Sequence, residues 1–445
     1  MKNPLLARFL AVTGLTILLV APLARIAALV AERSARRAEA VADIARGSGS
    51  AQLVTGPLLV VPVTRVRRET VVVDTATGRR EIRESRRDEL LHVLPEQVDA
   101  DARFTTELRY RGIHDVRVYR TLLKLQGSFV TADLLPTATD EELRIGQPWI
   151  AFGIEDARGI GAGLALTVDG AALRLEAGSR VAFLPGGVHA PVGSAGQLPE
   201  RLDFTAEVPL QGTERFEFVP VGRETRLHLS SDWAHPAFVG DLLPTTRTVR
   251  TDGFDASWAV SFLATDVPGR IAACASSGEC RRLDAARVGV EFTDPTDHYA
   301  RVERAVKYAL LFIVLTFVAF LLCEVLLPVT VHPVQYGLVG LALALFFLLL
   351  LSFAEQFGFA VAYALSALAC CGLLGWYVTK LLGGRGRGAL FSAALAAVYG
   401  LLYAILAAED YALLLGSLLL FAALALVMIT TRDVDWSRHG RRPAG

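Results

Sequence analysis

The chain has 445 residues, of which 53% are hydrophobic, and its 45 Lys and Arg residues balance 45 Asp and Glu residues. This composition is too apolar for an ordinary soluble enzyme or for a disordered chain. Residues 31–305 carry 34 basic and 39 acidic side chains, so the long central part is mildly acidic and shows no basic footprint for nucleic acid.

Residues 1–30 form an apolar run that follows Lys2 and contains Arg8 near its start. A cleaved signal peptide is the alternative, but no clean small-residue cleavage site follows, and Arg25 interrupts the place where cleavage would fall. We therefore expect a retained transmembrane anchor with a cytoplasmic N-terminus. Residues 31–50 are rich in Ala and mixed charges and end in Gly-Ser-Gly-Ser, which predicts a helical stalk.

Residues 51–305 have the texture of a β domain. Short apolar and β-branched runs are separated by turn residues, and they lie at 58–66, 69–84, 104–110, 116–125, 164–168, 204–210, 215–221, 225–230 and 257–262. The run at 69–84 reads as a hairpin with DTATG at its tip. This spacing predicts one large, mainly β, sandwich-like domain, or two in tandem. A helical piece is expected only near residues 137–143.

Two polar constellations in this region are candidate sites. Asp156 precedes Arg158 by two residues in EDARGIG, and SDWAHPAFVGDLLP gathers four candidates, Asp232, Trp233, His235 and Asp241. One interpretation is a ligand or acid/base site. The alternative is that these residues fasten turns and loops on the domain or at the bilayer surface. We favour the alternative, because large β domains routinely fasten long loops in this way.

No catalytic or metal-binding signature accompanies them. The eight His residues form no HExxH pattern and no zinc-like spacing with Cys, and the chain has no GxSxG elbow. We therefore assign no catalytic, metal-binding or cofactor-binding residue, expect no cofactor, and expect a protein that is not an enzyme.

Cys274 and Cys280 lie six residues apart in CASSGEC, around a Ser-Ser-Gly turn. In an oxidising compartment this spacing favours a small disulfide-closed loop. Two free thiols are the alternative, and a metal pair would need further His or Cys ligands nearby.

The C-terminal part, 306–430, contains five further segments long enough to cross a bilayer. They are 306–327, 334–354, 357–379, 389–408 and 411–430. A soluble bundle would show polar helix faces, and these segments show almost none. No charged residue falls at mid-depth, which weakens the case for an ion-coupled pump.

Charge orients this bundle. Lys380, Arg385 and Arg387 lie in one loop and four Arg residues lie in the tail, 431–445, whereas the loops at Glu355 and at 409–410 carry no Lys or Arg. The positive-inside rule places the basic loop and the tail in the cytoplasm. With the N-terminal anchor this gives six spans, both termini inside, and residues 51–305 outside the cytoplasm.

Several stretches resemble the CreD family of bacterial inner-membrane proteins. They are GPLLVVPV (56–63), DARGIG (156–161), HPAFVGDLLP (235–244), RAVKYALL (304–311), HPVQYGLVGL (332–341), LLLGSLLL (413–420) and TRDVDW (431–436). The resemblance covers essentially the whole chain. It implies an inner-membrane protein with a large periplasmic domain, linked to cell-envelope integrity, colicin tolerance and a two-component stress response. The family supplies no catalytic residue.

The fold expected is thus an α-helical membrane protein with six transmembrane helices and a large, mainly β, periplasmic domain. The leading functional hypothesis is a non-enzymatic envelope protein, partnered by the lipid bilayer and by an envelope protein or cell-wall component, with no prediction of oligomeric state. A membrane transporter or lipid-handling protein is the second hypothesis. A periplasmic enzyme centred on His235 is the third, and it requires Asp156, Arg158, Asp232 and His235 to meet in one cleft.

Overall fold

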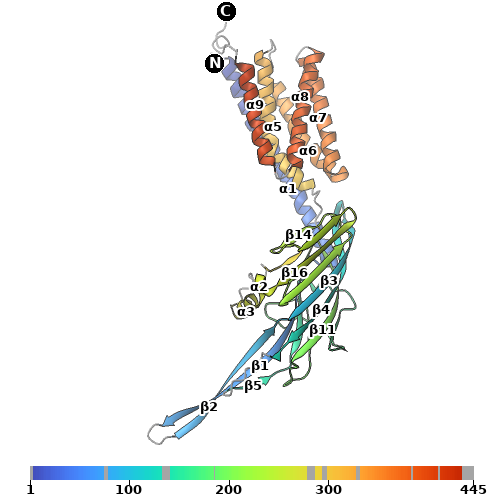
Figure 1. Cartoon of the computed structure of the whole chain (residues 1–445). Helices are drawn as coiled ribbons and strands as arrows, with labels where there is room; N and C mark the ends of the chain where they lie inside the picture. The colour runs from blue at the N-terminus through green and yellow to red at the C-terminus, as the bar shows by residue number, and fades with distance from the viewer. Residues whose placement is uncertain are drawn as a thin grey trace, which may run out of the picture. The chain divides into compact units, whose positions relative to one another are not determined.

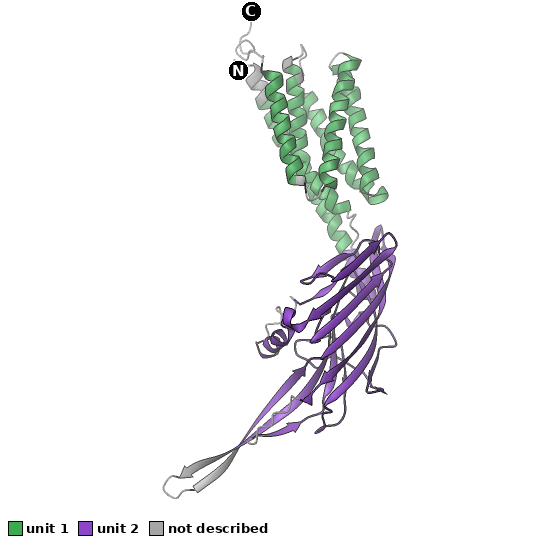
Figure 2. Cartoon of the chain, in the orientation of Figure 1, with its two compact units in different colours: residues 1–38, 296–445 green, residues 39–295 purple. Residues whose placement is uncertain are grey.

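The computed structural model describes residues 4–74, 79–132, 141–184, 186–277, 286–292, 298–326, 331–381, 384–408 and 411–432. The chain divides into two compact units (Figure 2). Residues 1–38 and 296–445 form the helical unit, and residues 39–295 form the β unit. The first boundary falls inside the segment expected to be a stalk.

The helical unit contains six helices long and apolar enough to cross a membrane, as the sequence predicts. They are α1 (Pro4–Ser48), α5 (His298–Leu326), α6 (Pro333–Phe357), α7 (Phe359–Leu381), α8 (Arg385–Ala407) and α9 (Ala412–Thr431), labelled in Figure 1. Buried side chains from five of them form one core that includes Val30, Phe317, Leu343, Leu374 and Leu402. No described residue of α9 is buried, which suits a helix facing lipid.

A polar cluster ties three of these helices together at one end of the bundle. Glu355 near the end of α6 accepts a hydrogen bond from the Tyr299 hydroxyl of α5 at 3.2 Å. The same carboxylate lies 3.7 Å from Arg33 of α1. Glu355 is only 12% exposed, and these contacts provide its carboxylate with partners on α1 and α5, as a site of low dielectric constant requires.

Helix α1 runs without a break through the expected anchor and the expected stalk. Its last turns belong to the β unit, where Asp43 pairs with Arg111 at 3.2 Å and Ser48 accepts a hydrogen bond from Arg109 at 2.7 Å. Both Arg residues lie at the tip of one β hairpin, so this end of α1 is fastened to the sheet by side chains.

The β unit is built from two sheets. The nine-stranded sheet contains β1 (Gln52–Asp74), β2 (Arg79–Val93), β5 (Glu141–Ile145), β6 (Trp149–Ile154), β9 (Glu176–Ala177), β10 (Val188–Pro191), β12 (Arg215–Val219), β14 (Ala237–Gly240) and β17 (Val288–Glu291). Its order is β14-β17-β12-β1-β6-β10-β9, and β2 and β5 also pair with β1. The β1–β2 hairpin confirms the hairpin predicted at 69–84 and is much longer.

The eight-stranded sheet carries the candidate site. It contains β3 (Gln97–Arg111), β4 (His114–Val130), β7 (Ala165–Val168), β8 (Ala171–Ala172), β11 (Arg201–Thr213), β13 (Glu224–Ser231), β15 (Thr246–Arg250) and β16 (Gly253–Ser261). Its order is β15-β16-β13-β3-β4-β11-β7-β8, with one parallel pair, β13 and β3.

Both sheets contribute side chains to one apolar core. Its large, almost fully buried members include Phe104, Phe129, Phe152, Phe204 and Phe216. Along β3, alternate residues enter this core, and the residues between them, such as Asp99 and Asp101, face outward. The outer face of the eight-stranded sheet is therefore polar for the same reason that its inner face is apolar.

Two sequence predictions in this unit are wrong. Residues 141–143, expected in a helical piece, are strand, because they pair with residues 65–67 of β1; residues 137–140 lie outside the described part of the chain. Conversely, a helix was missed: α3 (Val267–Ser277) follows the short α2 (Phe262–Thr265). Val267 and Ile271, one turn apart in α3, are buried against β1 residues, and this packing supports the helix.

Candidate functional site

The first sequence-predicted site is a tight turn after β6. Asp156 caps a short 3-10 helix, η2 (Ala157–Gly159), and is 8% exposed. Its carboxylate accepts hydrogen bonds from Arg158 Nε at 2.8 Å and Nη2 at 2.7 Å, and from the Arg158 backbone N–H at 3.1 Å. It also accepts from the Ser50 backbone N–H and hydroxyl, at 2.9 and 3.0 Å. Residues 156–161 are called the Asp156 turn below.

Gly159 lets this turn approach its neighbours. A Cβ placed on Gly159 would lie 2.1 Å from Gln52 Nε2 and 2.3 Å from the Gln211 carbonyl oxygen. Gln52 is buried there because its amide group bonds the backbone of Asp156 and the carbonyl of Gln211. The close packing around Gly159 therefore explains why a glycine stands at this position of the DARGIG run.

The electrostatics of the Asp156 turn favour anchoring over proton transfer. Hydrogen bonds from Arg158, against a smaller opposing effect of burial, hold the pKa of the Asp156 carboxyl well below its usual range. A carboxylate that is always ionised near neutral pH and already accepts five hydrogen bonds is a poor general base. This geometry supports the interpretation that Asp156 and Arg158 tie down a turn.

The second sequence-predicted group lies in the loop between β13 and β14. Asp232 accepts the Thr106 backbone N–H through both carboxylate oxygens, at 3.0 and 3.2 Å. Trp233 donates its indole N–H to the His235 carbonyl at 2.9 Å, and the Arg117 guanidinium lies 3.6 Å from the centre of the Trp233 ring. These contacts hold the loop against the β3–β4 hairpin.

His235 and Asp241 do not take part in a polar site with these residues. Both side chains are exposed, and the Asp241 backbone N–H donates to the Arg287 carbonyl at 3.1 Å. Within the described residues, no hydrogen bond or ion pair links Asp156 or Arg158 to Asp232 or His235. The structure therefore does not bring the four residues of the enzyme hypothesis together.

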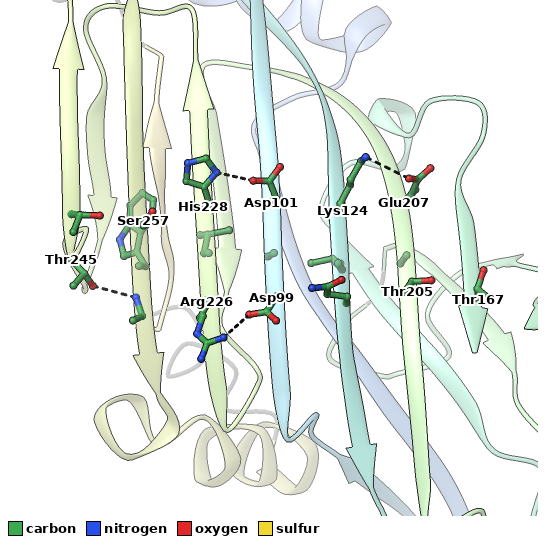
Figure 3. A pocket seen from close by; sticks show the side chains of 18 of the residues that line it. Asp99, Asp101, Lys124, Thr167, Thr205, Glu207, Arg226, His228, Thr245 and Ser257 are labelled. Atoms are coloured by element: carbon green, nitrogen blue, oxygen red, sulfur yellow. Dashed lines mark hydrogen bonds and ion pairs between the residues drawn. The ribbon is translucent and has the colours of Figure 1, made fainter. Parts of the chain in front are cut away.

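A site that the sequence analysis missed lies on the outer face of the eight-stranded sheet. It is a groove of about 980 Å³ lined by residues of β3, β4, β7, β11, β13, β15 and β16 (Figure 3). The strand register arranges its floor in two rows across the sheet. The first row is Ser257, His228, Asp101, Lys124, Glu207 and Ala165. The second row is Ala259, Arg226, Asp99, Gln126, Thr205 and Thr167.

Charges alternate along the first row. Asp101 lies between His228 and Lys124, and Glu207 follows Lys124. The Lys124 ammonium lies 3.8 Å from the Glu207 carboxylate, and in the second row Arg226 lies 3.6 Å from Asp99. Lys124, Glu207 and Arg226 are exposed and Asp99 is about one-third exposed, so water and ligands can reach them.

His228 is the best-connected member of the groove. Its Nδ1 lies 2.7 Å from Asp101 and its Nε2 lies 3.1 Å from Asp255. Burial opposes protonation, but the hydrogen bonds with Asp101 and Asp255 outweigh it and raise the pKa of His228 above its usual value. The imidazolium form therefore bridges three neighbouring strands.

Neither the groove nor the turns offer a metal cage. Among the residues that the structure describes, no group of three or more His, Cys, Asp or Glu side chains is placed to hold a metal ion. The alternating polar residues of LHLSS and VDADAR were visible in the sequence, but which strands lie side by side was not. The groove could be found only once the register was known.

The helices hold a much smaller space. A pocket of about 60 Å³ is lined by Ala11, Val12, Leu15, Val331, Pro333 and Tyr336. Nearby, Glu324 accepts hydrogen bonds from the Tyr336 hydroxyl and the Val331 backbone N–H, both at 3.2 Å. That volume suits about two water molecules.

Comparison with known proteins supplies the family. The family model described as "Inner membrane protein CreD" matches residues 4–437. The Inner membrane protein CreD of Escherichia coli (strain K12) is 35% identical over 436 residues, which cover 98% of this chain and 94% of that protein. The chain belongs to the CreD family.

Membership of the CreD family and the six apolar helices together identify a multi-pass inner-membrane protein. Solved structures add little. The M1 zinc metallopeptidase of Deinococcus radiodurans is 8% identical over 38% of each chain, with a TM-score of 0.19. A peptide-bound form of that enzyme gives the same identity and TM-score over 38% of this chain and 39% of its own. A likeness this weak carries no argument.

Only one cysteine of the predicted pair, Cys274, lies in the described part of this CreD-family chain. Cys274 is buried in α3 and takes part in a disulfide bond. Cys280 lies outside the described residues, so the pairing of Cys274 with Cys280 stays a prediction.

Proposed function

We propose that the β unit lies in the periplasm and acts as a non-enzymatic binding module of the cell envelope. The groove on the eight-stranded sheet takes an envelope protein or a cell-wall component, and through it the protein supports envelope integrity. One observation carries this proposal: a groove of about 980 Å³ whose floor is lined by exposed charges and hydroxyls. That volume lies at the upper end of the range of about 300–1,000 Å³ typical of ligand pockets.

The two sites singled out by sequence support the same conclusion, that the groove and not these sites binds a ligand. The carboxylates of the Asp156 turn and the Asp232–Trp233 loop are used in hydrogen bonds within the protein, whereas the charged side chains of the groove face solvent. The pocket lined mainly by described residues of α1 and α6 holds about 60 Å³, so it does not by itself support the transporter hypothesis. His235 is exposed and contacts Trp233, but it has no hydrogen bond or ion pair with Asp156, Arg158 or Asp232 in the described part of the chain, so the enzyme hypothesis gains no support.

The periplasmic placement rests on charge. Lys380, Arg385 and Arg387 lie near the turn between α7 and α8, and by the positive-inside rule that turn is cytoplasmic. Counting spans then puts residues 51–305 on the other side. Reporter fusions after residues 200 and 356 should read periplasmic, and fusions after residues 386 and 440 should read cytoplasmic. Opposite signals at 200 and 440 would overturn the placement.

The binding role is tested in cells by photo-crosslinking. A crosslinking side chain at Thr205, in the groove, should capture a specific envelope component, whereas one at Thr105, exposed on the same sheet but outside the groove, should not. The Thr205 product should disappear when Lys124→Glu reverses one groove charge. Identical products at both positions would contradict the proposal.

The sensitivity of cells to detergent provides a second test of the proposed function. Deleting the protein should raise detergent sensitivity, and Lys124→Glu should reproduce part of that effect. His235→Ala and Asp241→Ala should leave sensitivity unchanged, because neither side chain lines the groove. A folded, normally inserted His235→Ala protein that behaves like the deletion would instead favour a catalytic or ligand site at His235.

A further inference from the structure

We propose that the groove binds a short peptide that carries both a free ammonium and a free carboxylate group. This inference rests on the proposed function, because it names the ligand class of the same groove.

The pattern of charge selects for a ligand with both signs. Neighbouring strands lie about 4.8 Å apart, so Asp101 and Lys124, which pair in the register, present opposite charges at that spacing. A purely anionic ligand at Lys124 would also meet Asp101 and Glu207, which flank it on both sides. A purely cationic ligand at Asp101 would likewise meet Lys124. Such like-charge contacts disfavour the singly charged competitors.

A ligand with both groups reduces this conflict, because its ammonium neutralises Asp101 and leaves Glu207 as the one like charge beside its carboxylate. Its ammonium can lie against Asp101 while its carboxylate lies against Lys124, and the second row offers another opposite pair in Asp99 and Arg226. The rows lie about 6.7 Å apart, two residues along each strand. The groove therefore repeats one binding pattern, which suits a ligand of several residues.

The cations of the groove have hydrogen-bonding capacity to offer. Lys124–Glu207 at 3.8 Å and Arg226–Asp99 at 3.6 Å are longer than charge-assisted hydrogen bonds, which measure about 2.7–2.9 Å. Arg–carboxylate separations elsewhere in the β unit vary, for example from 2.7 Å in Arg158–Asp156 to 3.8 Å in Arg215–Glu217, so the groove pairs are among the longer ones. Lys124 and Arg226 donate no hydrogen bond to any residue that the structure describes. A ligand carboxylate can therefore accept bonds from them without breaking existing ones.

Neutral groups in the floor match a peptide backbone. Thr167, Thr205 and Ser257 carry hydroxyls, and Gln126 carries an amide; each can both donate and accept. None of the four side chains forms a hydrogen bond with another described residue. An extended peptide presents alternating N–H and C=O groups. Gln126 lies two residues from Lys124 on β4, and Thr205 of β11 pairs with Gln126, so these side chains can hydrogen-bond the backbone of a peptide held beside Lys124.

The test uses the full chain in lipid nanodiscs and four forms of one probe. Trialanine with both ends free is compared with trialanine amide, N-acetyl-trialanine and N-acetyl-trialanine amide, by ligand-observed NMR titration. We expect each blocked form to bind about tenfold more weakly than the free peptide, or worse, because each loses a charge-assisted contact.

Variants locate the binding. Lys124→Gln and Asp101→Asn should each weaken free trialanine about tenfold and should narrow the difference between free and blocked forms. The matched control is Glu107→Gln with Arg120→Gln, a pair 3.1 Å apart on the same two strands but outside the groove. That control should leave binding unchanged, and thermal melting should confirm that all variants fold.

Each contrary result has a defined meaning. Equal binding of all four peptides, or groove variants that bind as the parent does, overturns the inference. If free trialanine does not bind while crosslinking at Thr205 still captures a Lys124-dependent partner, the ligand class is wrong and the binding function stands. If melting changes but neither binding nor capture responds, the charges serve only the sheet, and both proposals fail.

Discussion

In the Asp156 turn a single carboxylate accepts five hydrogen bonds within the protein, whereas in the groove two cations lie 3.6 and 3.8 Å from their carboxylates without donating a hydrogen bond to a described residue. Burial explains the contrast. Asp156 is 8% exposed and must be fully satisfied by protein groups, while the groove side chains can exchange partners with water. The same residue types therefore stabilise the fold in one region and are available for binding in the other.

The largest expected effect is a loss of stability when the Asp156 turn is disrupted, which distinguishes this turn from the groove. Asp156→Ala removes the acceptor of Arg158 and Ser50 and leaves Gln52 in a disrupted turn, so we expect a loss of about 2–3 kcal/mol. For a unit of this size, the melting temperature should fall by roughly 4–12 °C. Differential scanning calorimetry checks this. Unchanged melting together with lost function would mean that the turn is a binding site after all.

A smaller loss is expected from Gly159→Ala, because its Cβ would clash with the Gln211 carbonyl oxygen, a backbone atom that cannot move aside freely. We expect destabilisation of about 1–3 kcal/mol. The control is Gly47→Ala, near the end of α1, where no atom lies within 4 Å of the new Cβ. That change should be neutral or stabilising by up to about 1 kcal/mol. Equal effects at both positions would contradict the close packing of the Asp156 turn.

The pH dependence should differ in sign between the two regions. The pKa of Asp156 is lowered, so its contribution to stability is complete above about pH 3.8 and is lost as the pH falls through the folded-state pKa. The pKa of His228 is raised, so its contribution is complete below about pH 6.5 and is lost as the pH rises through the folded-state pKa. Because His228 is partly exposed, screening keeps its share below about 1 kcal/mol.

The measurement for His228 is a comparison of His228→Gln with the parent chain between about pH 5.5 and pH 9. The parent should be more stable at the acid end, and the difference should shrink toward the alkaline end. A difference that grows with pH would contradict the hydrogen bonds of the imidazolium with Asp101 and Asp255.

The smallest effect on stability is expected in the groove itself. Lys124→Gln removes an exposed pair 3.8 Å long, so the free energy of unfolding should change by no more than about 0.5 kcal/mol. Chemical denaturation of the parent and the variant measures this. A loss near that of Asp156→Ala would show that the groove charges are structural and would remove the contrast between the regions.

How much the sequence predicts depends on the range of the interaction. The six apolar spans follow from composition alone, and the role of Asp156 and Arg158 follows from a spacing of two residues, so both were accessible from the sequence. Residues 141–143 were assigned wrongly because pairing with β1, far away in the chain, overrides their local helical composition. The helix α3 is hard to predict because it is short and contains Pro268 and Gly269, residue types that disfavour a helix interior, although Pro is well tolerated in a first helical turn.

The groove was also missed because it depends on pairing between strands that are far apart in the chain, and here the separation is larger still. Asp101, Lys124, Glu207 and His228 come from four strands, and the first and last of these residues are 127 positions apart. Alternation within each strand shows which side chains face outward, but it does not show which strands are neighbours. The parallel pairing of β3 with β13 brings Asp101 to His228, and no local signal announces it.

The order of strands in the nine-stranded sheet has a consequence for how the protein is made. Strand β1 begins at Gln52, yet it needs β12 at 215–219 beside it, and β12 in turn needs β17 at 288–291. At roughly 5–20 residues per second, the ribosome takes about 10–50 s to deliver the chain between β1 and β17. During this interval the nascent chain carries open strand edges and is held to the membrane by α1 alone. The helix α5 begins at His298, only a few residues after β17. Completion of the sheet and insertion of the second membrane helix therefore become nearly simultaneous steps, and chaperones or proteases would act on the chain mainly before them.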